Sequence, residues 1–519
     1  MKKFKKARVN GGSNYDSLLP ITMASRVTRV FHKILAARLT AKVPLDPRQK
    51  AFVPVDGCAD NIFLLDNIIK GAQRQRKPVC LAFLDVAKAF DCVSHMSLAR
   101  SLRRLGVPSP LVQYIATMYA YTSTVLKVGG RRSGPIRCGR GVRQGDPLSA
   151  ILFNCVMDEV LSELNPAIGY FLNKEVMVRC LAFADDLVLI ASSVDGLREQ
   201  VDRVQHALSL GGLRLNPAKS ASLRIDIDGK AKRWVVNPSP ILTIDGESVR
   251  SLSIVQTYKC LGLQAGPLGV RRSYGDFLTV GLDRLTRAPL KPQQRMFLLR
   301  CHLLPKLYHG LVLGEMTAKS LEGLDRLVRV AVRKWLHLPH DTPTGYFHAK
   351  ATAGGLEVPR LRYIIPPLKA SRMARVEESE DPVMQSVATS PIFLGARRRC
   401  TKTARVAGRV LSNGKDANDL LAIQLYASVD GRGLKQQGQT PHINTWVTDG
   451  SALLSGGDYI QAVKVRGSLL PSAERSSRGR RTGPVWCDAG CNAQGTQAHI
   501  SQSCARTHCF RCDGHNSVV

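Results

Sequence analysis

Two adjacent carboxylates, Asp185 and Asp186, lie between two apolar runs in the segment spanning residues 181–190. Apolar runs of this length that are bounded by polar residues are typical of buried strands, so we expect a hairpin with both aspartates in its turn. Two neighbouring like charges repel, and burial raises the cost of that repulsion. A divalent cation would remove this cost, and a site built from oxygen ligands suits Mg²⁺. The alternative is an ordinary acidic turn, because turns favour aspartate.

A third carboxylate, Asp85, follows a short apolar run at residues 79–84 that is predicted to be a strand. A carboxylate at the end of a strand can join an aspartate pair carried by a neighbouring strand. Three carboxylates can hold two cations, of which one lowers the pKa of a primer 3′-hydroxyl and the other stabilises the leaving pyrophosphate. The residues therefore point to two-metal nucleotidyl transfer, which needs no protein nucleophile.

The composition indicates a polyanionic partner. The chain has 519 residues, room for roughly three or four domains, and carries 74 Lys and Arg against 40 Asp and Glu, a formal charge of +34. Such an excess favours nucleic acid, although a membrane surface would also attract it. No uncharged apolar stretch reaches the ~18 residues needed to span a bilayer, and no apolar signal core follows the basic start. We expect an intracellular protein.

The elements that must position the carboxylates alternate between helix and strand patterns over residues 20–265, which suggests an α/β or α+β domain. Helices are predicted over residues 25–39, 96–105, 148–164 and 196–210, and a hairpin over residues 123–136 around Gly129 and Gly130. Residues 280–370 are predicted to be mostly helical, with a basic stretch at 326–334, and Trp335 is expected to be a core residue rather than a base-stacking one. Residues 375–480 are predicted to be polar and irregular. Their basic cluster at 475–481 is either a flexible arm that contacts phosphates or a solvated linker.

The cysteines divide into two groups. Nine are scattered between Cys58 and Cys400, and those inside apolar runs, such as Cys80, are expected to be buried thiols in a reducing compartment. Near the end of the chain, Cys487, Cys491, His499 and Cys504 are separated by three, seven and four residues, and three thiolates with one imidazole satisfy tetrahedral zinc. Cys509 and Cys512, flanked by His508 and His515, are rival ligands, and free surface thiols are the remaining alternative. A closed four-ligand site would serve folding and nucleic-acid contact rather than catalysis.

Taken together, these segments resemble a reverse transcriptase, and specifically one from a site-specific non-LTR retrotransposon. The matching segments, in chain order, are residues 20–25 and 49–52 with Asp60 and Asn61 in the fingers, 85–91 (motif A), 141–149 (motif B), 183–186 (motif C), 212–216 with Lys219 (motif D) and 258–262 (the primer grip). Residues 324–356 resemble the thumb and following region of elements that carry a C-terminal restriction-like endonuclease, and the CCHC spacing fits the zinc knuckle of the same elements.

The resemblance implies roles for individual residues. Asp85, Asp185 and Asp186 would bind two catalytic Mg²⁺ ions. The substrate-binding set would be Val86, Phe90, Arg143, Gln144, Gly145 and Lys219. Phe90 occupies the steric-gate position, where an aromatic ring would crowd a ribose 2′-hydroxyl, and a core phenylalanine is the less favoured alternative. Gln144 and Gly145 would shape the nucleotide pocket, Arg143 would contact template or phosphate, and Lys219 would contact pyrophosphate or face solvent.

One position departs from the family pattern. The family usually has arginine before the Pro-Ile of its first fingers motif, whereas Leu19 precedes Pro20 in this chain, after what looks like a short insertion. A lost charge-assisted contact to the triphosphate would weaken catalysis, unless Arg26 or Arg29 compensates. We therefore expect reduced activity, and equal primer-extension rates for this chain and its Leu19→Arg variant would reject that expectation.

The sequence thus predicts an α+β chain with the right-hand polymerase fold, followed by a basic linker and a small zinc knuckle. The expected domains are fingers and palm at residues 1–265, thumb at 266–375, basic linker at 376–483, and the knuckle with the truncated start of an endonuclease domain at 484–519. The endonuclease active site is expected to be absent, so the chain would be the central part of a longer polyprotein.

The expected function is RNA-directed DNA polymerisation in the nucleus. The partners would be the element RNA template, a nicked target DNA whose 3′ end serves as primer, and deoxynucleoside triphosphates, with no membrane. A catalytically silent nucleic-acid-binding remnant of such an element is the main alternative. A group II intron maturase would share the palm, but the thumb segment and the knuckle argue against it.

Overall fold

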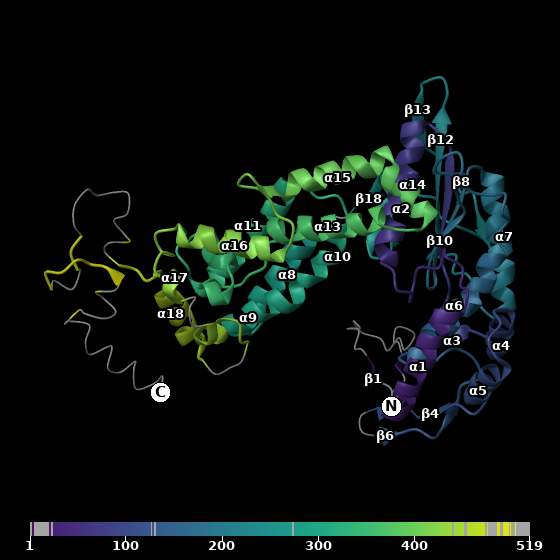
Figure 1. Cartoon of the computed structure of the whole chain (residues 1–519), viewed down its shortest axis with the longest axis horizontal. Helices are drawn as coiled ribbons and strands as arrows, with labels where there is room; N and C mark the ends of the chain where they lie inside the picture. Colours follow the sequence, from purple (N-terminus) through teal and green to yellow (C-terminus); the bar gives the residue numbers. More distant parts are fainter. Residues whose placement is uncertain are drawn as a thin grey trace. The chain divides into compact units, whose positions relative to one another are not determined.

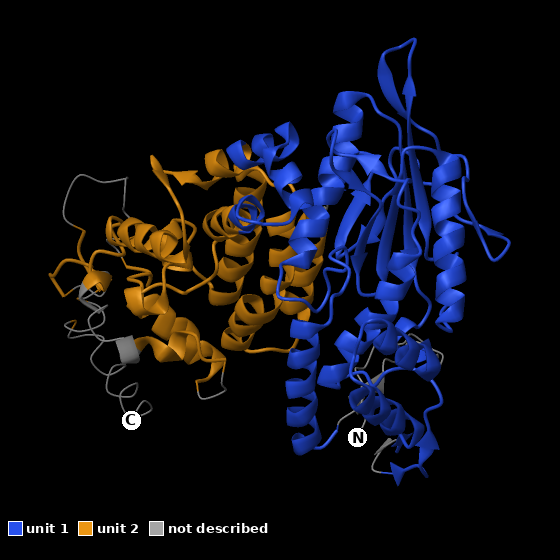
Figure 2. Ribbon diagram, turned by 45° about the vertical axis from the view of Figure 1, so that its right-hand side comes forward, with its two compact units in different colours: residues 1–272, 372–398 blue, residues 273–371, 399–519 orange. Residues whose placement is uncertain are grey.

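A computed structural model describes the backbone of most of the chain (Figure 1). The described residues are 3–4, 20–21, 24–125, 127–128, 131–271, 274–437, 441–450, 454–472, 475, 485–487, 491–497, 499 and 504. The chain divides into two compact units, residues 1–272 with 372–398 and residues 273–371 with 399–519, which Figure 2 colours separately. Within the described part of the chain, no helix is both long enough and apolar enough to cross a membrane.

The first unit is built on a five-stranded antiparallel sheet in the order β10-β11-β3-β12-β13. Its strands are β3 (Val79–Asp85), β10 (Cys180–Phe183), β11 (Asp186–Ala191), β12 (Ala221–Asp228) and β13 (Arg233–Val236). The remaining short strands of this unit are β1 (Lys3–Phe4), β2 (Pro20–Ile21), β4 (Ser123–Thr124), β5 (Lys127–Val128), β6 (Arg131–Arg132), β7 (Ile136–Arg137), β8 (Tyr170–Phe171), β9 (Met177–Val178), β14 (Thr243–Ile244), β15 (Glu247–Ser248), β16 (Tyr258–Cys260), β17 (Leu263–Gly266) and β18 (Gly269–Arg271).

Strand β3 is apolar along its whole length because both of its faces are covered. Cys80, Ala82 and Leu84 lie in one hydrophobic core with buried residues of the helices at 147–162 and 194–210. On the opposite face, the ring of Phe83 stacks on Tyr258 of β16 with centroids 4.8 Å apart. A strand covered on both faces appears as a continuous apolar run, which is the pattern that predicts β3 and β11 from the sequence.

The helices predicted for this unit are present with small shifts of their ends. The helices of this unit are α1 (Arg26–Lys42), α2 (Gly57–Gln75), α3 (Ala89–Cys92), α4 (His95–Arg104), α5 (Ser109–Ala120), α6 (Pro147–Ser162), α7 (Val194–Leu210) and α14 (Pro382–Thr389). The four predicted helices correspond to α1, α4, α6 and α7. The predicted hairpin at 123–136 is also present, with β4 paired to β7 and β5 to β6, while Gly129 and Gly130 at its tip lie outside the described residues.

Helix α1 turns a different face to the protein than its apolar spacing suggests. Ser25 caps it by accepting a hydrogen bond from the Thr28 amide at 3.1 Å. Val27 and Val30 are 80% and 61% exposed, whereas His32 is fully buried. The imidazole of His32 is within hydrogen-bond distance of a buried carboxylate, and it shares the inward face of α1 with Leu35 and Leu39, which pack in or against the hydrophobic core.

The second unit is mainly helical, as predicted for residues 280–370. Its helices are α8 (Gly275–Arg287), α9 (Pro292–Leu298), α10 (Pro305–Leu313), α11 (Ala318–Leu336), α12 (Thr344–His348), α16 (Gly414–Tyr426), α17 (Leu434–Gln437) and α18 (Gly456–Arg466), with a π-helical stretch at Leu299–Leu303, 3-10 turns at Ala351–Ala353 and Pro441–Val447, and the strand pair β19 (Arg405–Val406) and β20 (Arg409–Val410). The boundaries between the units fall within α13 (Leu361–Glu377) and α15 (Pro391–Ala404). Trp335 is 2% exposed and its indole N–H donates to Thr286 Oγ1 at 2.8 Å, so it is a core residue as expected.

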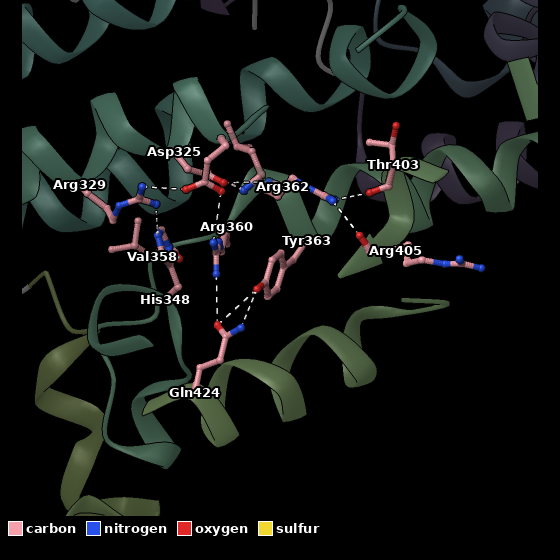
Figure 3. Close-up of polar contacts among 12 residues, drawn as sticks. Asp325, Arg329, His348, Val358, Arg360, Arg362, Tyr363, Thr403, Arg405 and Gln424 are labelled. Atoms are coloured by element: carbon pink, nitrogen blue, oxygen red, sulfur yellow. Dashed lines mark hydrogen bonds and ion pairs between the residues drawn. The ribbon is translucent and has the colours of Figure 1, made fainter. Parts of the chain in front are cut away.

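A buried polar network lies at the start of α13 (Figure 3). Both carboxylate oxygens of Asp325, on α11, accept backbone amides, from Leu361 at 2.8 Å and from Arg362 at 2.9 Å. Burial raises the pKa of Asp325 to about 7, although the two amides favour the charged form. Nearby, Glu322 pairs with Arg360 at 3.2 Å. A side chain of one helix thus satisfies the free amides at the N-terminus of another.

The prediction that residues 375–480 are irregular is wrong, because the described residues between 382 and 466 include the helices α14 to α18. Their buried apolar residues recur at helical spacing, as Met384 and Val387 do, but arginines and polar residues separate the short helices and dilute the pattern. Arg475, the first member of the basic cluster, is also not a free phosphate-binding arm. Its guanidinium pairs with Asp341 at 2.8 Å and Asp430 at 2.9 Å, while residues 476–481 lie outside the described part of the chain.

Candidate active site

The hairpin of β10 and β11 places the aspartate pair at one end of the sheet. Phe183 pairs with Asp186, so the turn consists of Ala184 and Asp185, and Asp186 is the first residue of β11 rather than part of the turn. Strand β11 pairs with β3 in a register that sets Asp186 directly opposite Asp85. Residues that face each other in an antiparallel pair have Cα atoms about 4.5–5.5 Å apart. The sheet therefore brings Asp85 close to the aspartate pair that begins 100 residues later in the sequence.

The three carboxylates hold their negative charge at an energetic cost. Burial raises the pKa of Asp186 to about 6, and repulsion from Asp185 and Asp85 adds to the rise. Burial also raises the pKa values of Asp185 and Asp85. Two lysines partly oppose these shifts: Lys219 Nζ lies 3.8 Å from Asp85 Oδ2, and the charge of Lys259 lowers the pKa of Asp186. Crowded carboxylate oxygens are the donors that Mg²⁺ prefers, so these residues fit a divalent cation.

Proton competition should make metal binding at this site depend on pH. A carboxylate whose pKa is near 6 is mostly charged at pH 7 and mostly protonated at pH 5, and only the charged form binds a cation. We expect the dissociation constant for Mn²⁺, a paramagnetic substitute for Mg²⁺, to rise about tenfold between pH 7 and pH 5 when measured by electron paramagnetic resonance. A dissociation constant that stayed constant over this range would contradict the raised pKa.

Backbone contacts fix Asp85 and the residues that follow it. The Asp85 amide donates to Ser220 Oγ at 3.2 Å, and the Asn216 amide donates to the Asp85 carbonyl at 2.8 Å. Val86 is 3% exposed and forms a bridge with Leu215. The segment that carries Lys219 is therefore tied to the end of β3, and the Lys219 side chain, which is 70% exposed, projects beside Asp85.

The loop before α6 lies against the segment that follows Asp85. The Gly141 amide donates to Val93 O and the Val142 amide to Phe90 O, both at 2.7 Å. Gly141 has φ +85°, and a Cβ atom there would lie 2.5 Å from the Asp91 carbonyl oxygen, so only glycine fits. Gln144 Nε2 donates to Asp91 Oδ1 at 3.1 Å. The glutamine side chain and the backbone after Asp85 are thus held side by side.

The other predicted substrate-binding residues have distinct surroundings. Gly145 is exposed with φ +99°. The guanidinium of Arg143 donates to Thr122 Oγ1 and lies 6.0 Å from the Tyr119 ring centroid, so protein side chains already engage it. Phe90 is half-buried and stacks on Phe153, with centroids 4.3 Å apart and ring planes at 17°. Because the ring is stacked on one neighbour and remains partly exposed, Phe90 could serve either as a steric gate or as a core residue.

A second cluster of possible ligands lies near the end of the chain. The sulfur and nitrogen ligand atoms of Cys487, Cys491, His499 and Cys504 all lie within 4.8 Å of one another. The Sγ atom of Cys504 is 3.9 Å from that of Cys487 and 3.7 Å from that of Cys491. Two thiolates on a tetrahedral zinc ion would be about 3.8 Å apart, because each Zn–S bond is ~2.3 Å long. The donor set and the sulfur separations therefore fit zinc.

Local backbone contacts shape this cluster. The Cys487 amide donates to Ala493 O at 2.8 Å, and the Cys504 amide donates to His499 O at 2.7 Å. The imidazole of His499 approaches Cys491 Sγ to 2.9 Å. The rival ligands Cys509, Cys512 and their flanking histidines lie outside the described residues.

Comparison with known proteins agrees with this geometry. The family described as "Reverse transcriptase (RNA-dependent DNA polymerase)" matches residues 6–264. The Pol polyprotein of the retrotransposable element R2DM of Drosophila melanogaster is 38% identical over 96% of the chain, and that of R2 of Nasonia vitripennis is 37% identical over 96%. The R2 Pol polyprotein of Popillia japonica is 34% identical, and the alignment covers 98% of the chain and 70% of that relative. The chain belongs to the R2 Pol family. It spans 47% and 48% of the fly and wasp R2 relatives, about half of their length.

One site residue of this R2-family chain has no counterpart among the sequence predictions. His32 Nδ1 lies 2.8 and 2.7 Å from the two carboxylate oxygens of Asp146, and its Nε2 lies 2.8 Å from the Tyr114 hydroxyl. Asp146 also caps α6 by accepting the Leu148 amide at 3.0 Å. The motif B loop is thereby tied to α1. No local pattern indicates this contact, because a single histidine in a helix has no partner within its own turn.

Proposed function

We propose that the chain is an RNA-directed DNA polymerase that extends a primer by two-metal nucleotidyl transfer. The observation that carries the proposal is the strand register that sets Asp186 opposite Asp85, with Asp185 next to it. Magnesium ions held by these carboxylates would activate the primer 3′-hydroxyl and neutralise the leaving pyrophosphate. The chain itself would supply the ligands, their spacing and the surrounding charge. Lys219, 3.8 Å from Asp85, would add a positive charge near the leaving group.

The nucleotide would bind between the motif B loop and the segment after Asp85. Gln144, held by Asp91, and Gly145, which has no side chain, would border the base and sugar. Phe90 would face the sugar as a steric gate, with Val86 packed beneath it. Arg143 would contact template or phosphate after release from Thr122. These assignments rest on the family motifs together with the contacts among these residues.

Charge supports a nucleic-acid partner. Not one acidic residue occurs between Asp91 and Asp146, a segment that includes the hairpin of β4 to β7. The arginines of this hairpin and the loop after it are exposed: Arg131, Arg132, Arg137 and Arg140. Exposed arginines gathered in this way repel one another unless a polyanion neutralises them. A template or primer phosphate backbone would do so.

We further propose the setting in which this polymerase acts. The template would be the RNA of the element itself, and a nicked chromosomal strand would provide the primer, so the reaction would take place in the nucleus. The support is membership of the R2 Pol family, since the relatives above are Pol polyproteins of retrotransposable elements. Deoxynucleoside triphosphates would be the second substrate.

The Cys/His cluster is proposed to bind one structural zinc ion. We expect elemental analysis to find about one zinc per chain, and Cys504→Ser to lower zinc content strongly, because three ligands bind zinc less tightly than four. Cys301→Ser is the matched control, since Cys301 is an exposed free cysteine elsewhere in the same unit. If Cys504→Ser kept its zinc and Cys509→Ser lost it, the zinc ligands would include the rival Cys509 instead of Cys504.

The direct test of the proposed function is nucleotide incorporation by the unmodified chain. A DNA primer annealed to an RNA template should be extended with deoxynucleotides in the presence of Mg²⁺, and should not be extended when EDTA replaces it. The competing function, a silent nucleic-acid-binding remnant, predicts a gel shift with the same primer and template but no extension. Binding without extension would therefore replace the polymerase proposal with the remnant.

A further inference from the structure

The turn that carries Asp185 contains a strained residue. Ala184 has φ +55°, in the left-handed region that residues with a side chain rarely adopt. Glycine is the usual residue at the first position of a two-residue hairpin turn with positive φ. Alanine keeps this conformation only if the surroundings stabilise it. The neighbours of Ala184 should therefore reveal what holds the turn in place.

The side chain of Gln49 provides this support. It is 2% exposed, and its carboxamide group forms hydrogen bonds with both the backbone N–H and the backbone carbonyl of Ala184. Gln49 Oε1 accepts the Ala184 amide hydrogen at 2.8 Å, and Gln49 Nε2 donates to the Ala184 carbonyl at 3.2 Å. A single side chain thus satisfies both backbone polar groups of Ala184, whose backbone is strained. It does so from 135 positions away in the sequence.

Gln49 is itself held rigidly against the hairpin. Its backbone forms a parallel bridge with Ala182, and the Lys50 amide donates to Ala182 O at 3.1 Å. The side chain of Asn61, on α2, donates to the same carbonyl at 3.1 Å. Gln49 Oε1 also accepts the Ala51 amide at 3.1 Å. The glutamine therefore reaches Ala184 from a fixed backbone rather than from a mobile loop.

We propose that Gln49 is a positioning residue for the metal-binding aspartates. By fixing the backbone of Ala184, it sets the place of Asp185 and of Asp186 relative to Asp85. It touches neither primer nor nucleotide, so its loss should weaken metal binding without changing nucleotide binding. This inference rests on the proposed function in one respect only, namely that the three aspartates bind divalent cations.

The test compares Gln49→Met with the unmodified chain. Methionine keeps the length of the side chain but has neither the donor nor the acceptor. We expect the Mn²⁺ dissociation constant, measured by electron paramagnetic resonance, to rise about tenfold, since misplaced ligands lose chelation geometry. The KM for deoxynucleotide should change less than about twofold, because Gln49 is proposed to make no contact with the nucleotide. Gln49→Glu, which keeps an acceptor for the Ala184 amide, should show a smaller rise in the dissociation constant.

The matched control is Gln200→Met. Gln200 is also fully buried and also binds the backbone of a turn, accepting the Asn165 amide at 3.0 Å and donating to the Asn165 and Ile168 carbonyls, but that turn carries no metal ligand. Both variants should lower the melting temperature, and only Gln49→Met should weaken Mn²⁺ binding. Equal Mn²⁺ affinities for the two variants would show that Gln49 is merely structural.

Rescue at the strained residue gives a second criterion. Ala184→Gly lowers the cost of a positive φ, so it should restore most of the Mn²⁺ affinity that Gln49→Met loses. Absence of rescue would overturn the proposal. If Gln49→Met does not fold, the same comparison is made with Gln49→Glu, with and without Ala184→Gly. Because Mn²⁺ binding is read directly, a chain that binds Mn²⁺ but extends no primer would disprove the polymerase function and still test Gln49.

Discussion

Replacement of Asp185 by asparagine should reduce deoxynucleotide incorporation by at least ~10³-fold, equivalent to about 4 kcal/mol of transition-state stabilisation. The change keeps the shape of the side chain but removes one of three negative charges, the one next to the facing pair Asp85 and Asp186. Asparagine is a weak ligand for Mg²⁺, so the metal that aligns primer and phosphate would be lost or displaced. Single-turnover primer extension on an RNA template measures the effect on chemistry separately from product release.

The control for this variant is Asp195→Asn. Asp195 lies on α7 with a side chain that is 93% exposed, and it contacts Arg198 at 3.3 Å. The same chemical change there should alter incorporation by less than about twofold, because exposed ion pairs contribute little. Both variants should bind the primer–template with the affinity of the unmodified chain. Incorporation by Asp185→Asn at the rate of Asp195→Asn would remove Asp185 from the metal site.

The catalytic carboxylates could be predicted from the sequence because their signals are local. Asp85 ends an apolar run, and Asp185 and Asp186 interrupt another, so strand ends and a tight turn follow from patterns within ten residues. Local patterns do not determine which strands pair. The order of the reverse transcriptase motifs along the chain indicates that β3 pairs with β11. The predicted α+β polymerase fold and the predicted non-LTR retrotransposon reverse transcriptase family are confirmed. The domain boundaries and the roles of the substrate-binding residues stay predictions.

What the sequence could not supply are contacts between distant polar residues. Gln49 and Ala184 are 135 positions apart, and His32 and Asp146 are 114 apart. Each partner alone has an unremarkable local context, and only the folded sheet and helices bring the pairs together. The helices between residues 382 and 466 were missed for another reason, since each buries only a few apolar residues among many polar ones.

Phe90→Val is expected to raise incorporation of ribonucleotides relative to deoxynucleotides by about 10²-fold, or about 2.7 kcal/mol of lost discrimination. The ring of Phe90 is fixed by its stack on Phe153, and Phe52 meets it edge-on with centroids 6.3 Å apart. A ring held from two sides cannot swing away from an added 2′-hydroxyl, so it would reject a ribose by steric overlap. Valine removes the ring while keeping an apolar, β-branched side chain. The measurement is the ratio of kcat/KM for a ribonucleotide and the matching deoxynucleotide on one template.

Phe63→Val separates a steric gate from a core residue. Phe63 lies on α2, is 9% exposed, and also packs against another aromatic ring, that of Phe393, at 5.8 Å. Both variants lose a comparable apolar contact and should show lower melting temperatures. Only loss of a ring that faces the sugar can change the ratio of the two nucleotides. If Phe90→Val and Phe63→Val left that ratio equally unchanged, Phe90 would be a core residue, and discrimination against ribose would have to come from another residue near Gln144 and Gly145.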